Sequence, residues 1–247
     1  ISGNLGTSDN DVILDRDQDK SKDDGISFIP NTPPVAEDDE ITLFEGQIVN
    51  IYETVLFNDL DNDTLFIDSL SGVTGLNGTI TLDSDGRTLF YEAGSYFDFY
   101  AAGETHTEFF TYHIVDGRGG EHTATITVTV IGVNDAPIAQ DDVALIADDS
   151  TNVNGNVLAD NGNGADSDVD ASDVISVSAV LGGNVGVASA GTDGGLFTIN
   201  ADGTFNFNPN GDFAYLDTGE TQDTTVQYTI DDGNGGTDTA TITITVT

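Results

Sequence analysis

The chain contains no cysteine, no methionine and no tryptophan among its 247 residues. Without cysteine it has no disulfide framework, no catalytic thiol and no thiolate-bound metal site. These absences do not identify a cellular compartment. They do exclude a disulfide-stapled scaffold and a thiol enzyme.

Basic residues are almost as scarce. Three of the 5 lysines and arginines lie in the first 22 positions, so residues 31–247 hold 37 of the 44 acids against two arginines, Arg87 and Arg118. A net charge of −35 on that span opposes compaction through self-repulsion and makes nucleic acid and anionic membranes poor partners. We therefore expect screening salt, bound divalent cations or both to neutralise it.

Long apolar runs are also missing. No segment approaches the roughly 18–20 apolar residues that span a bilayer, so membrane insertion is not expected. No signal peptide and no initiator methionine are visible, and the chain begins at Ile1, so we expect a mature fragment or an excerpt of something longer. Many Thr, Val, Ile and Gly residues with few helix formers favour an all-β protein.

The chain repeats itself. Asp116-Gly-x-Gly-Gly returns 116 positions later as Asp232-Gly-x-Gly-Gly, each followed by an alternating Thr-rich strand. Asn31-x-x-Pro34 returns 103 positions later as Asn134-Asp-x-Pro137. Two copies of the same motifs indicate two copies of one repeat unit, and the difference between the two offsets places 13 extra residues inside the second repeat. We predict an N-terminal arm at 1–30 and repeats at 31–133 and 134–247.

Each repeat is expected to be a two-sheet sandwich. The turn signals of the first repeat separate seven short strands, and seven strands in about 100 residues are typical of an immunoglobulin-like domain. The last hairpin is the clearest, with one apolar face at period two on each strand. The predicted strands cover residues 40–44, 47–52, 64–70, 78–82, 87–92, 107–115 and 121–131.

The repeats resemble a known family. The segments 213–220 (Phe-Ala-Tyr-Leu-Asp-Thr-Gly-Glu) and 228–236 (Tyr-Thr-Ile-Asp-Asp-Gly-Asn-Gly-Gly) are similar to the VCBS repeat. The segment 132–137 (Gly-Val-Asn-Asp-Ala-Pro) is similar to the junction between cadherin-like tandem repeats of large secreted bacterial adhesins, especially of the RTX type. The resemblance covers residues 31–247 and implies two tandem seven-stranded, immunoglobulin- or cadherin-like β-sandwiches.

Acidic residues gather in matching loops of both repeats. In such a sandwich the loop after the second strand and the tip of the last hairpin lie at one end, and alternate carboxylates of an extended loop converge. Ca²⁺ takes 6–8 oxygen ligands and would relieve their repulsion. The expected ligands are Asp59, Asp61, Asp63 and Asp116 in the first repeat, Asp166, Asp168, Asp170 and Asp232 in the second, and Asn134 and Asp135 on the stiff linker.

The resemblance adds further expectations. It places Glu45 at the cadherin glutamate between the first two strands, with Asp148 as its counterpart in the second copy. It implies an extracellular, cell-surface setting, calcium as the cofactor and neighbouring repeats of the same chain as partners. The leading hypothesis is that the chain is a calcium-rigidified spacer that supports cell adhesion and has no catalytic activity. The alternatives are a calcium-dependent carbohydrate- or peptide-binding module that contacts surface glycans, and an accessory region of a secreted hydrolase.

The N-terminal arm carries one more alternative. Residues 15–23 place oxygens at alternate positions as an EF-hand loop begins, but Lys20 stands where the turn needs Gly and Ile26 where Glu belongs. We expect a solvated arm or the tail of a preceding domain. The apolar residues 12–14 could instead act as a donor strand that joins copies of the chain into a filament.

Overall fold

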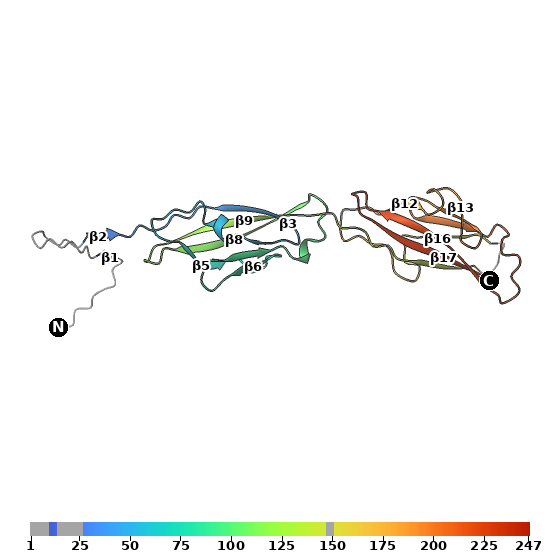
Figure 1. The fold of residues 1–247 in the computed structure, drawn as a ribbon, viewed down its shortest axis with the longest axis horizontal. Coiled ribbons are helices and arrows are strands. Elements are labelled where there is room, and N and C mark those ends of the chain that lie inside the picture. Colours follow the sequence, from blue (N-terminus) through green and yellow to red (C-terminus); the bar gives the residue numbers. More distant parts are fainter. Residues whose placement is uncertain (1–9, 14–26, 147–150) are drawn as a thin grey trace, which may run out of the picture. The chain divides into compact units, whose positions relative to one another are not determined.

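The computed structural model describes residues 10–13, 27–146 and 151–247. These residues form two units, each described by itself below (Figure 1). The first unit ends with Thr105–Ile131 and the second comprises Gly132–Thr247 together with the short segment Asp98–Glu104. Within the described residues no helix is long and apolar enough to cross a membrane.

The first unit is a sandwich of seven strands, as predicted. One sheet has the order β3-β9-β8-β5 and the other β4-β7-β6; β3 runs parallel to β9, and the remaining pairs are antiparallel. The strands are β3 (Asp39–Phe44), β4 (Ile48–Asn50), β5 (Phe66–Ser71), β6 (Thr79–Leu82), β7 (Leu89–Glu92), β8 (Thr105–Val115) and β9 (Glu121–Ile131).

The core of the first unit is made by the predicted apolar faces. Phe110, Tyr112 and Ile114 on β8 are buried, and so are the alternate residues of β9 from Ala124 to Val130. The intervening residues are mostly threonine and face outward. Phe97, which belongs to an aromatic run at 96–100, is also fully buried.

The second unit repeats this plan with one strand more than predicted. Its sheets have the orders β10-β17-β16-β12 and β11-β15-β14-β13. The additional strand is β13, two residues long, which lies in a segment where the second repeat is longer than the first. The strands are β10 (Asp142–Ile146), β11 (Val153–Asn156), β12 (Ser176–Val180), β13 (Ser189–Ala190), β14 (Leu196–Ile199), β15 (Thr204–Asn208), β16 (Gln222–Asp231) and β17 (Thr237–Val246).

Two short helices depart from the expected strand pattern. The strand expected over 47–52 ends at Asn50, and α1 (Tyr52–Val55) follows it. Asn50 Oδ1 accepts a hydrogen bond from the Tyr52 amide at 3.1 Å, and Tyr52 and Val55, three residues apart, both turn inward. Helical spacing therefore buries two side chains that a strand would place on opposite faces. The second is η1 (Ser95–Phe97), a single 3₁₀ turn.

The arm contributes one described hairpin. β1 (Asn10–Ile13) pairs antiparallel with β2 (Ser27–Pro30) of the same chain. Val12 and Ile13 of the suggested donor strand lie in this pairing, whereas Leu14 and the EF-like segment 15–23 lie outside the described residues.

Candidate metal centre

The acidic loop of the second unit is held against the linker by backbone pairing. Ile138 and Ser167 form an isolated antiparallel bridge, with N···O distances of 2.7 and 3.1 Å. The Asp170 amide donates to Asp168 Oδ1 at 2.9 Å, which closes an Asx turn inside the loop. The Asp135 amide donates to Asp170 Oδ2 at 2.9 Å, so the linker and the loop meet.

The tip of the hairpin between β16 and β17 supplies Asp232, which is 3% exposed. Its Oδ1 accepts from the amides of Asn234 at 2.7 Å and Gly236 at 3.0 Å, and its Oδ2 accepts from Asn134 Nδ2 at 2.9 Å. Burial acts to raise the pKa of the Asp232 carboxyl, but these hydrogen bonds outweigh it and hold the pKa below its usual value. Asp232 is therefore a fixed anion beside the linker.

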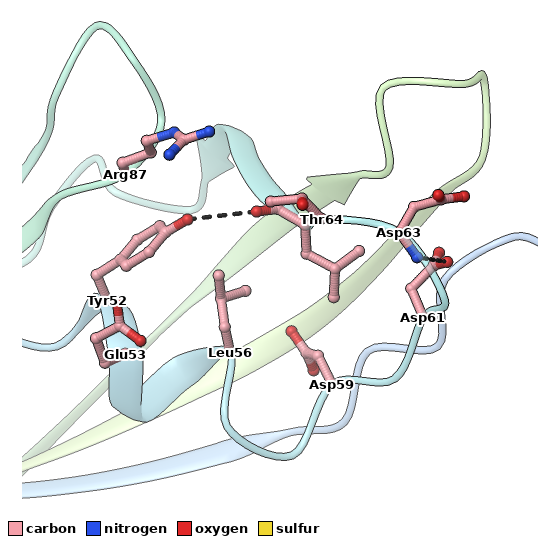
Figure 2. Close-up of a pocket in the computed structure, with 9 residues that line it drawn as sticks. Tyr52, Glu53, Leu56, Asp59, Asp61, Asp63, Thr64 and Arg87 are labelled. Atoms are coloured by element: carbon pink, nitrogen blue, oxygen red, sulfur yellow. Dashed lines mark hydrogen bonds between the residues drawn. The ribbon is translucent and has the colours of Figure 1, made fainter.

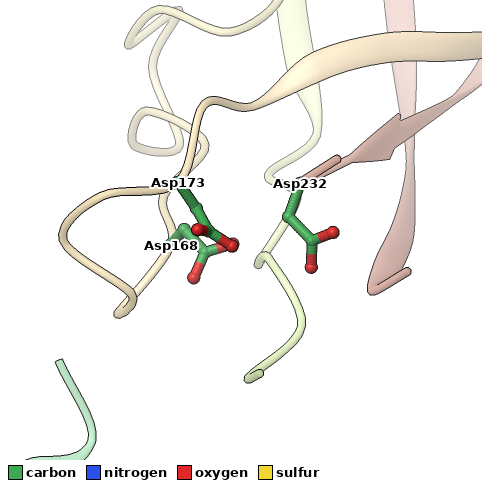
Figure 3. A group of neighbouring side chains, drawn as sticks. All are labelled: Asp168, Asp173 and Asp232. Atoms are coloured by element: carbon green, nitrogen blue, oxygen red, sulfur yellow. The ribbon is translucent and has the colours of Figure 1, made fainter. Parts of the chain in front are cut away.

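Three carboxylates meet at this point (Figure 3). Asp168 and Asp173 come from the loop before β12 and face Asp232 on the hairpin, and each offers an oxygen within 4.8 Å of the others. Among the residues that the structure describes, no other group of three acidic, histidine or cysteine side chains meets this condition.

Four side-chain oxygens around the cluster are buried and accept no hydrogen bond from the described residues: Asn134 Oδ1, Asp168 Oδ2, Asp170 Oδ1 and Asp173 Oδ2. A buried polar atom without a partner costs free energy unless something else binds it. All four are oxygen atoms, three of them on carboxylates, which is the donor set of a hard divalent cation such as Ca²⁺. The residues present therefore fit calcium.

The neighbouring acids are electrostatically coupled to this cluster. Burial raises the pKa of Asp170, and the charges of Asp173 and Asp168 raise it further. Burial likewise raises the pKa of Asp135, with added contributions from the charges of Asp98 and Asp168. A cation bound among these carboxylates would lower all of these pKa values.

Asp166, also a predicted ligand, faces a different set of groups. Its Oδ1 accepts from the Gln140 amide at 2.7 Å, and its Oδ2 lies 3.4 Å from the Tyr228 hydroxyl, which also donates to Asp142 Oδ2 at 2.8 Å. Burial raises the pKa of Asp166. Asp166 thus sits in a tyrosine–carboxyl network beside the cluster of Asp168 and Asp232.

The first unit contains a related arrangement. Asn31 Nδ2 donates to Asp116 Oδ2 at 2.6 Å, and the Asp63 amide donates to Asp61 Oδ1 at 2.9 Å, matching Asn134–Asp232 and Asp170–Asp168. Asp59 accepts from the Tyr112 hydroxyl at 3.0 Å, as Asp166 does from Tyr228. Asn31 Oδ1 and Asp61 Oδ2 are buried oxygens without a hydrogen-bond partner among the described residues.

The units differ in two respects. Arg118 stands where the second unit has Asn234, and its Nη1 lies 3.4 Å from Asp63 Oδ2. Asp173 lies in a part of the acidic loop that the first unit lacks: Phe66 pairs with Val115 as Ser176 pairs with Asp231, so the segment between Asp63 and β5 is three residues shorter than the one between Asp170 and β12. The first arrangement therefore has one carboxylate fewer and one guanidinium more than the second.

The remaining predicted ligand, Glu45, follows β3, and its amide donates to Ile131 O at 3.0 Å. Because β3 and β9 run parallel, Glu45 lies at the opposite end of the first unit from Asp59, Asp61, Asp63 and Asp116. Its proposed counterpart Asp148 lies outside the described residues.

Sequence reasoning missed Asp173 and Asn31. Asn31 occupies the same place as Asn134 in the repeated opening phrase, so the offset of 103 could have found it. Asp173 has no acidic counterpart in the first repeat, and comparison of the repeats could not single it out. A further acid three residues after Asp170 in a loop of alternating acids was the available signal.

Family models of two bacterial domain types match the chain, one over each repeat. Residues 134–247 match the family model of the bacterial cadherin-like domain, and residues 31–129 match that of the bacterial Ig domain. Both are all-β sandwich types, in agreement with the two units, and neither is an enzyme domain.

One curated relative aligns along most of the chain. The calcium-binding lectin RapA2 of Rhizobium johnstonii is 29% identical over an alignment of 243 residues, which covers 87% of this chain and 97% of the lectin. Among solved structures, domains EC1–2 of human mucin-like protocadherin align with 87% of this chain and 98% of their own length, at 17% identity and a TM-score of 0.45. Mouse cadherin-23 EC22–24 aligns with 88% of this chain and 67% of its own, at 17% identity and a TM-score of 0.47.

Proposed function

We propose that the chain is a calcium-binding, adhesion-related module of an extracellular bacterial protein. The observation that carries this proposal is the set of four buried, unpartnered oxygens on Asn134, Asp168, Asp170 and Asp173, beside the fixed anion of Asp232. Calcium would be held by these residues and by Asp135. It would supply the positive charge and the ligand bonds that the carboxylates lack.

The comparisons support the setting. A bacterial cadherin-like domain covers the unit that holds the cluster, and the curated relative is named as a calcium-binding protein. We infer a location outside the cell or at its surface, with neighbouring repeats of the same longer chain as partners.

In its finer form the proposal makes the chain a spacer. Asn134 and Asp135 lie on the linker itself, and Pro137 restricts the backbone that follows them. An ion bound to these residues would tie the linker to the Asp168–Asp232 cluster and stiffen the passage from one repeat to the next.

A second candidate function is calcium-dependent binding of carbohydrate. The observation that favours it is the lectin relative, 97% of whose length is covered by the alignment. The two candidates share the calcium centre and differ in whether the chain itself contacts a glycan.

Calcium binding is tested by calorimetry of the whole chain in calcium and in excess chelator. Binding to the folded state alone stabilises it by about 2.7 kcal/mol when the ion is at 100 times Kd. We expect Asp168→Asn to lose most of this calcium-dependent rise in melting temperature. Asp193→Asn, an exposed acid on another loop, is the control and should keep it. Equal melting temperatures in calcium and chelator would contradict the proposal.

The spacer form has its own measurement. Small-angle scattering of the wild type in calcium should give a narrow distribution of interatomic distances. The chelated wild type and calcium-loaded Asp135→Ala should both give a broader one, with the melting of each unit retained in the variant. If Asp135→Ala in calcium scatters as the wild type does, the linker residues do not stiffen the chain.

A further inference from the structure

The first unit contains a recess next to its acidic loop (Figure 2). Its volume is about 430 Å³, within the range of about 300–1,000 Å³ that is usual for small-molecule sites. Tyr52 and Arg87 lie on one side and Asp61 and Asp63 on the other, while Leu56 contributes an apolar surface between them.

Arg87 is the unexpected member of this lining. It is one of two arginines in a span with 37 acids, yet within the described residues its guanidinium makes no ion pair. Its Cζ instead lies 4.7 Å from the centre of the Phe66 ring, a cation–π contact that holds the group in place. The N–H donors of this guanidinium are therefore oriented but make no hydrogen bond to the described residues.

The opposite side offers acceptors. Asp61 Oδ2 is buried and accepts no hydrogen bond from the described residues, and Asp63 carries a second carboxylate, 3.4 Å from Arg118. Glu53 adds an exposed carboxylate beside Tyr52, whose hydroxyl lines the recess and makes only a long contact of 3.4 Å with Leu65 O. A ligand in the recess would thus meet donors on one side and acceptors on the other.

We propose that this recess binds a neutral sugar unit of a polysaccharide through direct hydrogen bonds. Arg87 would donate to ring or hydroxyl oxygens, and the partly exposed Asp63 and the exposed Glu53 would accept from hydroxyl hydrogens. The lining favours this class because its four carboxylates, on Glu53, Asp59, Asp61 and Asp63, repel an anion, while donors and acceptors on opposite sides suit a neutral ligand. A hydroxyl group both donates and accepts, so a polyol satisfies both sides at once.

This inference rests on the second candidate function, carbohydrate binding, and locates it in the first repeat, away from the cluster around Asp168. The acidic loop that borders the recess is partly neutralised by the guanidinium of Arg118. Sugar binding in the recess should therefore depend less on calcium than the cluster around Asp168 does.

The test uses the full chain in calcium and neutral tetrasaccharides built from glucose, galactose or mannose, followed by amide resonances and titration calorimetry. At millimolar sugar we expect at least one of them to shift the amides of Glu53, Asp61 and Arg87. Arg87→Gln should weaken its binding at least about tenfold, the scale of losing charge-assisted hydrogen bonds. Arg118→Gln, which changes the other arginine of the repeats, is the matched control and should bind within about threefold of wild type.

Each other outcome overturns the proposal in a distinguishable way. If sugar binds equally well to Arg87→Gln, the chain is a lectin but this recess is not its site. If no sugar binds while calcium still raises the melting temperature, the recess assignment and the lectin function fail and the calcium module stands. If lysine methyl ester binds in the recess and the sugars do not, the ligand class is wrong. Melting curves of both variants verify that each remains folded.

Discussion

The two repeats build the same framework at the end of the sandwich that holds the acidic loop. In the first, the Tyr112 hydroxyl lies 3.0 Å from both Glu37 O and Asp59 Oδ1; in the second, the Tyr228 hydroxyl lies 3.1 Å from Gln140 O, 2.8 Å from Asp142 Oδ2 and 3.4 Å from Asp166 Oδ2. In both, an Asn of the segment that leads into the unit donates to the buried Asp of the hairpin tip. The backbone and the tyrosine therefore hold the carboxylates in a similar arrangement in both repeats.

The two repeats differ in what neutralises the carboxylates of this loop. The second repeat surrounds its centre with Asp168, Asp173 and Asp232 and no cationic side chain among the described residues. The first has a shorter loop without a residue equivalent to Asp173, and it brings Arg118 to Asp63. With one carboxylate fewer and one guanidinium more, the first loop is less suited to Ca²⁺ than the second, although the surrounding framework is the same. We infer that calcium binds the second repeat more tightly than the first.

The largest expected effect is this difference in affinity. Extracellular modules bind calcium with Kd of about 10⁻⁴–10⁻³ M, so millimolar titration covers the relevant range. The amides of Gly235 and Gly119, at equivalent places on the two hairpin tips, provide matched reporters. We expect Gly235 to shift at lower calcium than Gly119. Identical titration curves would show that Arg118 and the missing counterpart of Asp173 do not discriminate against the ion.

A reciprocal exchange sharpens the comparison. Asn234→Arg places a guanidinium beside Asp173 and Asp232, and should abolish the calcium response of the second repeat. Arg118→Asn combined with insertion of Ala-Ser-Asp after Asp63 gives the first acidic loop the length and ligand set of the second, and should give the first repeat a calcium response. We expect the stability gained in calcium to move from one repeat to the other by up to about 2.7 kcal/mol at 100 times Kd.

The control for the exchange is Arg118→Asn alone. It removes the guanidinium without supplying the missing carboxylate, so its calcium response should lie between those of the wild type and the double variant. A wild-type response in the double variant would mean that other differences, rather than the guanidinium and the missing carboxylate, separate the repeats.

Much of this fold was predictable because its signals are local. The alternating faces of β8 and β9 and the repeated phrases at 31 and 134 depend on neighbouring residues and gave the sandwiches and the strand order of each hairpin. The helix α1 was not predicted, because the inward turn of Tyr52 and Val55 depends on burial that only the folded unit supplies.

The site was predictable only in part, for a related reason. The Asp-x-Asp-x-Asp spacing brought Asp168 and Asp170 into the predicted cluster, and the repeated hairpin tip brought in Asp232. The use of Asp173, and the ion pair between Arg118 and Asp63, depend on contacts between loops that are distant in sequence. The assignment of calcium to these residues stays a prediction.

The third prediction concerns a property that the repeats share. Burial raises the pKa of Asp39 and of Asp142 to about 6. These folded-state values lie above the unfolded value, so the folded chain binds more protons between pH 4 and 6, and stability falls as the pH rises through the folded pKa. In chelator we expect each repeat to gain about 1 kcal/mol between pH 7 and pH 5.5.

Single variants separate the two contributions. Asp39→Asn should reduce the pH dependence of the first repeat and Asp142→Asn that of the second, with melting in chelator followed at both pH values. An unchanged pH dependence in both variants would place the titrating groups elsewhere. A change confined to one repeat would show that the shared tyrosine framework does not set these pKa values.

The smallest expected effect is on trypsin cleavage after Arg118. Trypsin must take this side chain into its own pocket, so Arg118 has to leave Asp63 first. A partly exposed ion pair is worth less than about 1 kcal/mol, so Asp63→Asn should speed cleavage by no more than about fivefold. Asp61→Asn, which leaves the Arg118 partner in place, is the control.

If the guanidinium rather than calcium neutralises this loop, adding chelator should also change the rate only slightly. Mass spectrometry of the cleaved chain measures this rate, and an acceleration by chelator of more than about tenfold would mean that calcium holds the first hairpin tip as firmly as the second.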